Sequence, residues 1–122
     1  MESPFKGKTG LRRLVNAFGY SMAGIKAAYQ NEDAFRQEVL MAIVLIPLAL
    51  YLGKTGLECA VMIASVMLVI IVELINSSIE ATVDRISLEN HLLAKRAKDI
   101  GSAAVLLSLF TLIVVWSLIL FR

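Results

Sequence analysis

The sequence predicts an all-α membrane protein with three transmembrane helices and an N-terminal amphipathic surface helix. The 122 residues are 58% hydrophobic with a mean hydropathy of +0.76, which is too apolar for an ordinary soluble domain. Three uncharged stretches, at 39–52, 59–72 and 100–121, are separated by charged segments. Because the chain is too short for several domains, we expect residues 1–122 to form a single membrane domain.

The surface helix is expected at 11–29. Basic side chains such as Arg12, Arg13 and Lys26 lie outside its apolar face, which suits a cytoplasmic membrane surface with anionic lipids. Packing of the helix against protein would use the same pattern, and both contacts can hold at once. The apolar residues recur at spacings of three and four: Leu11, Leu14, Val15, Phe18, Met22, Ile25 and Tyr29.

The first membrane helix is expected at about 34–52. Asn31 is the predicted N-cap, and Glu32 and Asp33 follow it in the first turn, where negative charge favours the helix dipole. The uncharged part is only about 21 Å long as a helix, so the span must include preceding turns to cross a core of about 30 Å. Pro47 removes one backbone donor and predicts a bend.

The second and third membrane helices are expected at about 57–84 and 92–121, with a break at 86–91. Thr55 and Glu58 have the spacing of a capping box, so the first two spans should form a hairpin. Small residues near the start of the third helix predict close helix contact there: Gly101, Ser102, Ala103 and Ala104.

The distribution of positive charge predicts the orientation. Ten of the twelve Lys and Arg residues lie before Val39 or between Arg85 and Lys98. The positive-inside rule therefore places the N-terminus and the segment between the second and third spans in the cytoplasm. No apolar segment of the signal-peptide type precedes the first span, so this span is expected to direct insertion.

A polar stripe leaves the second span on its cytoplasmic side. Glu73 is its deepest member, and because a carboxylate in an apolar span costs at least ~2 kcal/mol, we expect it to face protein or water and to have a function. We interpret Glu73 as a general base for a group in the membrane. At about 100° per residue, the stripe occupies an arc of roughly 100° and consists of Glu73, Asn76, Ser77, Glu80 and Asp84.

The shallower carboxylates suit a different task. Glu73 and Glu80 are separated by about 10 Å along the helix axis, so they cannot readily share one small metal ion. Glu80 and Asp84 suit a cation in water, and Glu32 is a candidate second carboxylate. Charged residues at the same interface would suit a metal-bound polyphosphate: Arg13, Lys95, Arg96, Lys98 and Asp99.

Simpler roles stay open for these side chains. The charges at 80–85 can be a solvated helix end, and those at 95–98 can serve only as topology determinants. His91 can be a surface histidine, and Asn76 can be a hydrogen-bonding contact between helices. A non-enzymatic cation transporter is a second class of function, but 61–72 offers only Ser65 as a polar group, which favours chemistry at the cytoplasmic interface.

The stretch Glu73-Leu-Ile-Asn-Ser-Ser-Ile-Glu-Ala-Thr-Val-Asp-Arg85 resembles the signature of the prokaryotic diacylglycerol kinase family, small integral-membrane lipid kinases. The resemblance continues at 19–21, 31–32, 34–38 and 97–105 and covers nearly the whole chain beyond the N-terminal tail. It implies a homotrimer with active sites shared between neighbouring subunits in the bacterial inner membrane. It also implies transfer of the γ-phosphate of ATP to diacylglycerol, which gives phosphatidate.

The resemblance further implies a role for each matching residue. Glu73 would be the general base on the lipid hydroxyl, and Glu32 and Glu80 would hold Mg²⁺ at the nucleotide. The implied ATP contacts are Arg13, Tyr20, Glu32, Asn76, Glu80, Glu89, Asn90, His91, Lys98 and Asp99. The implied lipid contacts are Arg13, Ala34, Phe35, Arg36, Gln37, Glu38, Glu73, Ser102 and Trp116.

A related branch of the family phosphorylates undecaprenol, a long polyprenyl alcohol. Its signature more often has threonine where this chain has Ser77. The sequence therefore favours diacylglycerol over undecaprenol as the lipid substrate.

Overall fold

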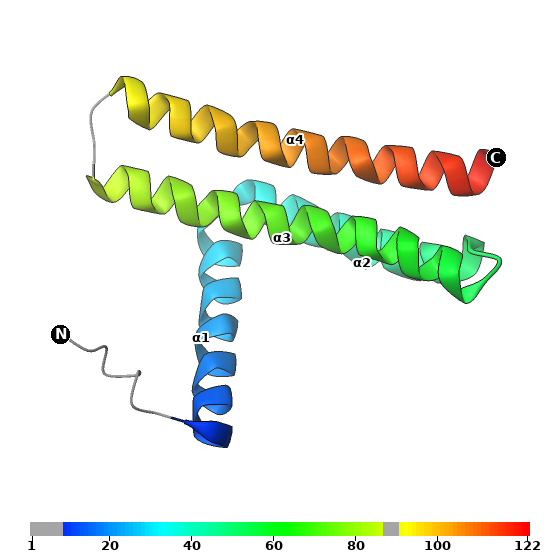
Figure 1. The fold of residues 1–122 in the computed structure, drawn as a ribbon, viewed down its shortest axis with the longest axis horizontal. Helices are drawn as coiled ribbons and strands as arrows, with labels where there is room; N and C mark the ends of the chain where they lie inside the picture. The colour runs from blue at the N-terminus through cyan, green and yellow to red at the C-terminus, as the bar shows by residue number, and fades with distance from the viewer. Residues whose placement is uncertain (1–8, 87–90) are drawn as a thin grey trace. The chain divides into compact units, whose positions relative to one another are not determined.

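The computed structural model describes residues 9–86 and 91–122, which form four α-helices (Figure 1). The helices are α1 (Gly10–Asn31), α2 (Asp33–Leu52), α3 (Gly56–Ile86) and α4 (Leu92–Phe121). The predicted all-α class is confirmed. The chain divides into two compact units, one ending at Asn31 and one from Glu32 to Arg122.

Helix α1 is the described helix of the first unit. Its 22 residues end with Asn31, whose side-chain amide donates to the Ala27 carbonyl at 2.8 Å. Large apolar side chains are exposed along the helix: Leu11, Leu14, Val15, Phe18, Met22, Ile25 and Tyr29.

The prediction that Asn31 caps the next helix is wrong. The N-cap of α2 is Glu32, which has an extended backbone with φ −120° and ψ 112°. Asn31 is instead the last residue of α1, where its amide Nδ2 donates to a carbonyl of the preceding turn. The side chain of Glu32 makes no capping hydrogen bond, so its carboxylate is not committed to the helix end.

The hairpin between α2 and α3 has the predicted Thr55 cap, while the Glu58 side chain reaches back to Lys54, one residue before the position that a capping box requires. The Glu58 amide donates to Thr55 Oγ1 at 3.1 Å, and Glu58 Oε1 accepts from the Lys54 amide at 2.9 Å. A cap of this kind stabilises a helix by about 1 kcal/mol. Pro47 lies inside α2, which is nevertheless one continuous helix.

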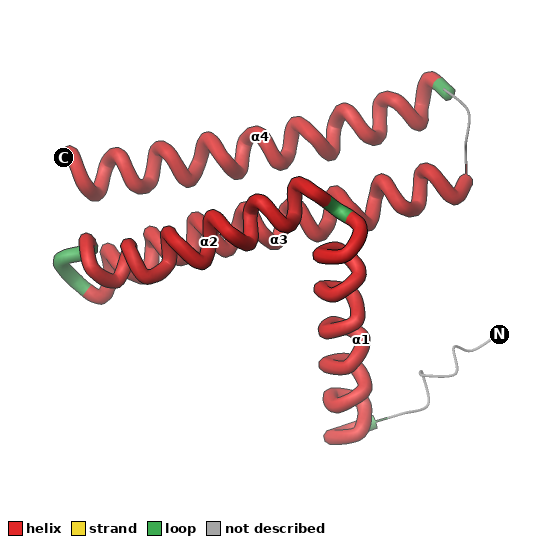
Figure 2. The backbone as a smooth tube through the Cα atoms, turned by 180° about the vertical axis from the view of Figure 1, so that it is seen from behind, coloured by secondary structure: helices red, strands yellow, loops and turns green. Residues whose placement is uncertain are grey.

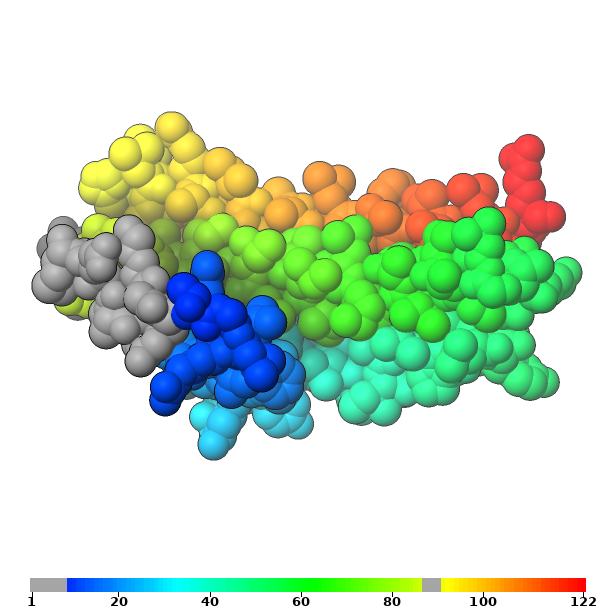
Figure 3. Space-filling view, turned by 60° about the horizontal axis from the view of Figure 1, so that its bottom comes forward, coloured from blue at the N-terminus to red at the C-terminus, as the bar shows by residue number. Residues whose placement is uncertain are grey.

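Helix α3 is the centre of the second unit. It packs against both α2 and α4, and Figures 1 and 2 show these helices running alongside it from opposite views. The space-filling view also places α3, in green, between α2 and α4 (Figure 3). All three helices are long and apolar enough to cross a membrane. The three predicted spans are therefore confirmed by length and composition.

One buried cluster joins the three membrane helices. It consists of Ala49 from α2, Met62 and Val66 from α3, and Trp116 from α4. The Trp116 indole Nε1 donates to the Met62 carbonyl and to Ser65 Oγ, both at 3.2 Å. Since lipid tails are as apolar as these side chains, close packing and this polar contact hold the helices together here, rather than removal from water.

We expect Trp116→Phe to weaken this contact without removing the ring. Hydrogen bonds between membrane helices contribute about 0.6 kcal/mol on average and about 1.7 kcal/mol at most. The free energy of unfolding should therefore decrease by an amount within that range. Equilibrium unfolding in detergent measures it. Thr111→Val is a matched control, because the Thr111 hydroxyl bonds only within its own helix, to the Leu107 carbonyl at 2.8 Å. Equal stability of the two variants would contradict a stabilising role for the indole bond.

Candidate functional site

Four carboxylates lie near the start of α2 and along the second half of α3. We call Glu32, Glu38, Glu73 and Glu80 the acidic site. Glu38 and Glu73 are buried, and Glu32 and Glu80 are half-buried. Glu73 interacts electrostatically with each of the other three. Because like charges in a poorly solvated place repel strongly, such a cluster is suited to binding cations or protons.

The side chains of the polar stripe become more exposed from Glu73 toward the C-terminal end of α3. Glu73 is 4% exposed and Asn76 is 7% exposed, whereas Glu80 is half-buried and Asp84 is exposed. Ile75, next to these residues in the chain, is 55% exposed. The stripe therefore turns toward the neighbouring helices, as its spacing predicted, and it leads from a buried carboxylate to the open end of α3.

Asn76 links the two acidic residues of α3. Its amide Nδ2 donates to Glu80 Oε1 at 3.0 Å, and the amide also interacts with the Glu73 carboxylate. Its Oδ1 is buried and has no hydrogen-bond partner among the described residues. Asn76 thus couples the orientations of the buried and the shallower carboxylate.

Glu38 is the member of the site that sequence reasoning did not single out, beyond its place in the implied lipid contacts. It is 9% exposed, and its Oε2 is buried without a hydrogen-bond partner in the described chain. The sequence holds a signal, because Glu38 directly precedes an uncharged stretch too short to cross the membrane without it. In the structure Phe35, three residues earlier on the same helix face, is 2% exposed. A charged residue one turn from a core aromatic in an apolar helix indicates a carboxylate that faces protein.

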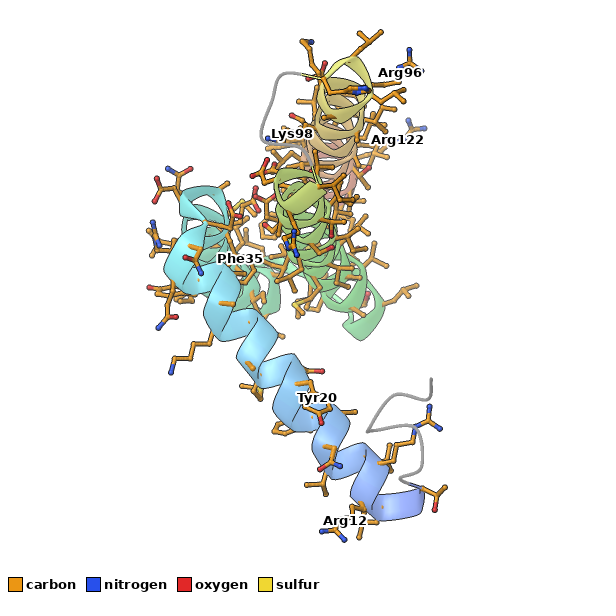
Figure 4. All side chains as sticks on the ribbon, turned by 90° about the vertical axis from the view of Figure 1, so that its left-hand side faces the viewer. Arg12, Tyr20, Phe35, Arg96, Lys98 and Arg122 are labelled. Carbon is orange, nitrogen blue, oxygen red and sulfur yellow. The ribbon has the colours of Figure 1, made fainter. Side chains whose placement is uncertain are left out.

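The basic residues of α4 lie near the open end of the stripe. Lys98 Nζ pairs with Asp84 Oδ1 at 2.6 Å, which joins α4 to α3, and Lys95 Nζ pairs with Asp99 Oδ2 at 2.7 Å within α4. Figure 4 shows Lys98 and Arg96 leaving α4 on different sides. Exposed ion pairs of this kind contribute little to stability, so these cations can exchange their partners readily for an anionic ligand.

The structure does not bring every predicted contact residue to the acidic site. Arg13 and Tyr20 lie on α1, in the other compact unit. Glu89 and Asn90 lie outside the described residues. His91 is the N-cap of α4, and its Nδ1 accepts from the Leu93 amide at 3.0 Å. The ATP contacts of these residues stay predictions.

The implied lipid contacts are similarly dispersed. Ala34 and Gln37 are exposed on the first turns of α2, and Arg36 pairs there with Asp33. Ser102 is exposed on α4. Trp116 packs at the level of Met62, which is 11 residues from Glu73 on α3, or about 16 Å along the helix. Its contacts are therefore with the core cluster and not with the acidic site.

The predicted Mg²⁺ ligands do not form a closed cage. Within residues 9–86 and 91–122, no group of three His, Cys, Asp or Glu side chains is arranged to hold a metal ion. Mg²⁺ usually takes only one or two carboxylates and completes its shell with water and substrate phosphates. Glu32 and Glu80 fit that requirement in number and chemistry, and their role stays a prediction.

Comparisons with known proteins agree with the resemblance seen in the sequence. The family model described as "Prokaryotic diacylglycerol kinase" matches residues 19–120. A "Diacylglycerol kinase" of Pseudomonas aeruginosa is 58% identical over 97% of this chain and 96% of its own length. A protein of the same name from Haemophilus influenzae is 50% identical over 93% of this chain and 96% of its own length. One from Escherichia coli K12 is 46% identical over 92% of this chain and 92% of its own length. The chain therefore belongs to the prokaryotic diacylglycerol kinase family.

Proposed function

We propose that this protein is a diacylglycerol kinase that transfers the γ-phosphate of ATP to the hydroxyl of diacylglycerol and yields phosphatidate. The observation that carries the proposal is Glu73, a buried carboxylate on a membrane helix whose polar stripe opens toward exposed basic residues. Relatives of nearly full length that are named diacylglycerol kinases support this substrate over undecaprenol.

Glu73 acts as the general base in this proposal. Its carboxylate takes the proton of the lipid hydroxyl, whose oxygen forms the new bond to the γ-phosphorus while the bond between that phosphorus and the β-phosphate oxygen breaks. Phosphatidate forms, and ADP leaves on the aqueous side. A base within an apolar span suits an acceptor that stays in the membrane, because little water is available there to take the proton.

Glu32 and Glu80 are the proposed Mg²⁺ ligands. They would hold the ion at the nucleotide, where it would supply charge neutralisation for the phosphates. The Glu32 side chain makes no capping hydrogen bond, and the Glu80 carboxylate accepts a hydrogen bond from Asn76. Both carboxylates can therefore face the nucleotide, one from the start of α2 and one from α3. The proposed nucleotide contacts also include Lys98 and Asp99 and the residues on α1 and at 89–91.

The proposed lipid side of the site is formed by residues 34–38 of α2, with Ser102 and Trp116 of α4. Residues at the start of α2 suit a lipid headgroup, because Ala34 and Gln37 are exposed there, while Glu38 is buried and interacts electrostatically with Glu73. Trp116 would contact acyl chains deeper in the membrane. This division keeps the reacting hydroxyl near Glu73.

We also propose a homotrimer in the bacterial inner membrane, with the N-terminus cytoplasmic and α1 lying on the membrane surface. The exposed apolar side chains of α1 and the position of its basic residues support the surface role. The placement of ten of twelve basic residues supports the orientation. Three helices cannot by themselves enclose the acidic site, a nucleotide and a lipid, which supports an assembly of several chains.

Mixing two inactive variants tests the shared sites of this assembly. We expect Glu73→Gln and Arg13→Ala chains to restore activity when they are co-assembled, because some sites then combine intact residues from two subunits. Differently tagged chains, purified through both tags, ensure that only mixed oligomers are assayed. If mixed oligomers form and stay as inactive as each parent, Glu73 and Arg13 of one site do not come from different chains.

The substrate is tested with purified protein in lipid vesicles. Labelled ATP is supplied with diacylglycerol or with undecaprenol, and the lipid products are separated by thin-layer chromatography. We expect label in phosphatidate and little in undecaprenyl phosphate. Label mainly in undecaprenyl phosphate would reverse the substrate assignment, and cation flux into vesicles without ATP consumption would favour a transporter.

A further inference from the structure

Gly101 of α4 lies buried against the side chain of Asn76 on α3. A Cβ atom added at Gly101 would collide with Asn76 Oδ1 and lie 3.3 Å from Asn76 Cγ. Leaving aside the chain neighbours of Gly101 and the backbone of its own helix, no other atom of the described residues would be within 4 Å. Glycines on α1 differ, since a Cβ at Gly19 or Gly24 would meet nothing within 4 Å. The missing side chain at Gly101 therefore makes room for one particular amide group.

The chemistry of this amide fixes which end faces Gly101. An ionised carboxylate can only accept hydrogen bonds, so the Asn76 group 3.0 Å from Glu80 Oε1 must be the Nδ2 donor. Asn76 Oδ1 then points the other way, toward α4, where it is buried without a hydrogen-bond partner in the described residues. Contact with Gly101 and donation to Glu80 thus belong to one orientation of Asn76.

We infer that Gly101 is a positioning residue for phosphoryl transfer: the space it leaves holds the Asn76 amide against Glu80 and fixes the direction of that carboxylate. This inference rests on the proposed function, because it refines the role of Glu80 as a Mg²⁺ ligand. Hydrogen bonds from outer groups commonly orient the carboxylates that bind metals, and their loss typically costs about 10- to 100-fold in metal affinity.

A methyl group at Gly101 should act on the amide and not on the helix pair. The atoms it would meet are at the far end of the Asn76 side chain, which can rotate away, whereas no backbone atom of α3 stands within 4 Å. After that rotation Nδ2 leaves Glu80, whose carboxylate becomes free to turn. The helices can keep their spacing while the orientation of the metal ligand is lost.

The test is a double-mutant cycle of Gly101→Ala and Asn76→Ala. We expect Gly101→Ala to raise the Mg²⁺ concentration needed for half-maximal activity by about 10-fold, with a smaller effect on turnover at saturating Mg²⁺. Asn76→Ala should raise it at least as much. The double variant should resemble Asn76→Ala alone, because the methyl then has no amide to displace. Gly24→Ala is the matched control and should leave the Mg²⁺ requirement unchanged.

The other outcomes overturn the inference. Costs that multiply in the double variant would mean that the methyl acts by separating the helices, and an unchanged Mg²⁺ requirement in Gly101→Ala would mean that Glu80 needs no such support. If Gly101→Ala fails to assemble, recovery of assembly in the double variant supports the inference, and continued failure contradicts it.

The inference can fail independently of the proposed function. If the wild-type protein phosphorylates no lipid, the proposed function is rejected, and the same cycle is read in melting temperature. We then expect Gly101→Ala to lower the melting temperature when Asn76 is present and to have little effect in the Asn76→Ala background. An equal decrease in both backgrounds would reject the contact between Gly101 and the amide.

Discussion

Glu73→Gln is expected to lower turnover by about 10²- to 10⁴-fold, the range typical for loss of a positioned general base. Glutamine has nearly the same volume and can still form hydrogen bonds within the buried end of the stripe, but it cannot accept the proton of the lipid hydroxyl. The variant should therefore fold, assemble and bind ATP. Turnover with a saturating short-chain diacylglycerol and nucleotide affinity are measured on the same preparation.

Glu58→Gln provides a matched control on the same helix. Glu58 lies at the opposite end of α3, where a glutamine oxygen can still accept a hydrogen bond from the Lys54 amide. The turnover of the Glu58→Gln variant should therefore match that of the wild type. Glu73→Asp should lose much activity as well, because withdrawal of the carboxylate by about 1 Å spoils its alignment. Near-normal turnover of Glu73→Gln would reject the assignment of Glu73 as the general base. Failure of the variant to assemble would indicate that Glu73 has a structural role.

Glu80→Gln is expected to raise the Mg²⁺ requirement by at least about 10-fold, because loss of a partner that only orients a metal ligand already costs about 10- to 100-fold in metal affinity. The substitution removes a negative oxygen from a coordination sphere that water can fill, so higher Mg²⁺ should partly restore activity. Glutamine can still accept from Asn76 Nδ2, so the stripe should keep its structure.

The Mg²⁺ dependence of initial rates at fixed ATP measures this effect. Glu58→Gln again serves as the control, since it removes the same charge from α3 far from the acidic site. If the Glu80→Gln variant has the Mg²⁺ dependence of the wild type, the assignment of Glu80 as a Mg²⁺ ligand is wrong.

Much of the fold could be predicted because its signals are local. The three apolar stretches and the spacing of the capping box depend only on neighbouring residues, and the structure has the corresponding helices and cap. The same holds for the stripe on α3, since the geometry of one helix suffices to place Glu73, Asn76 and Glu80 on one face. The burial of Glu73 followed from the cost of exposing a carboxylate to lipid.

The features that the sequence did not predict depend on contacts between helices or on competition between adjacent residues. Asn31 and Glu32 are both polar residues before a helix, and Glu32 became the N-cap because α1 continues through Asn31. The burial of Glu38 depends on the face that α2 turns toward α3. Close contact at Gly101 was expected, but its partner Asn76 is set by the register of α4 on α3.

A single-turnover measurement tests most directly whether Glu73 promotes phosphoryl transfer to diacylglycerol. The protein is first loaded with γ-labelled ATP and Mg²⁺, short-chain diacylglycerol is then added in rapid mixing, and label in the lipid extract is followed with time. The wild type should transfer label to phosphatidate in a fast first turnover, while Glu73→Gln should bind the same amount of ATP and transfer label at least about 10²-fold more slowly. Equal first-turnover rates in the two proteins would contradict the account, as would a wild type that transfers no label to the lipid.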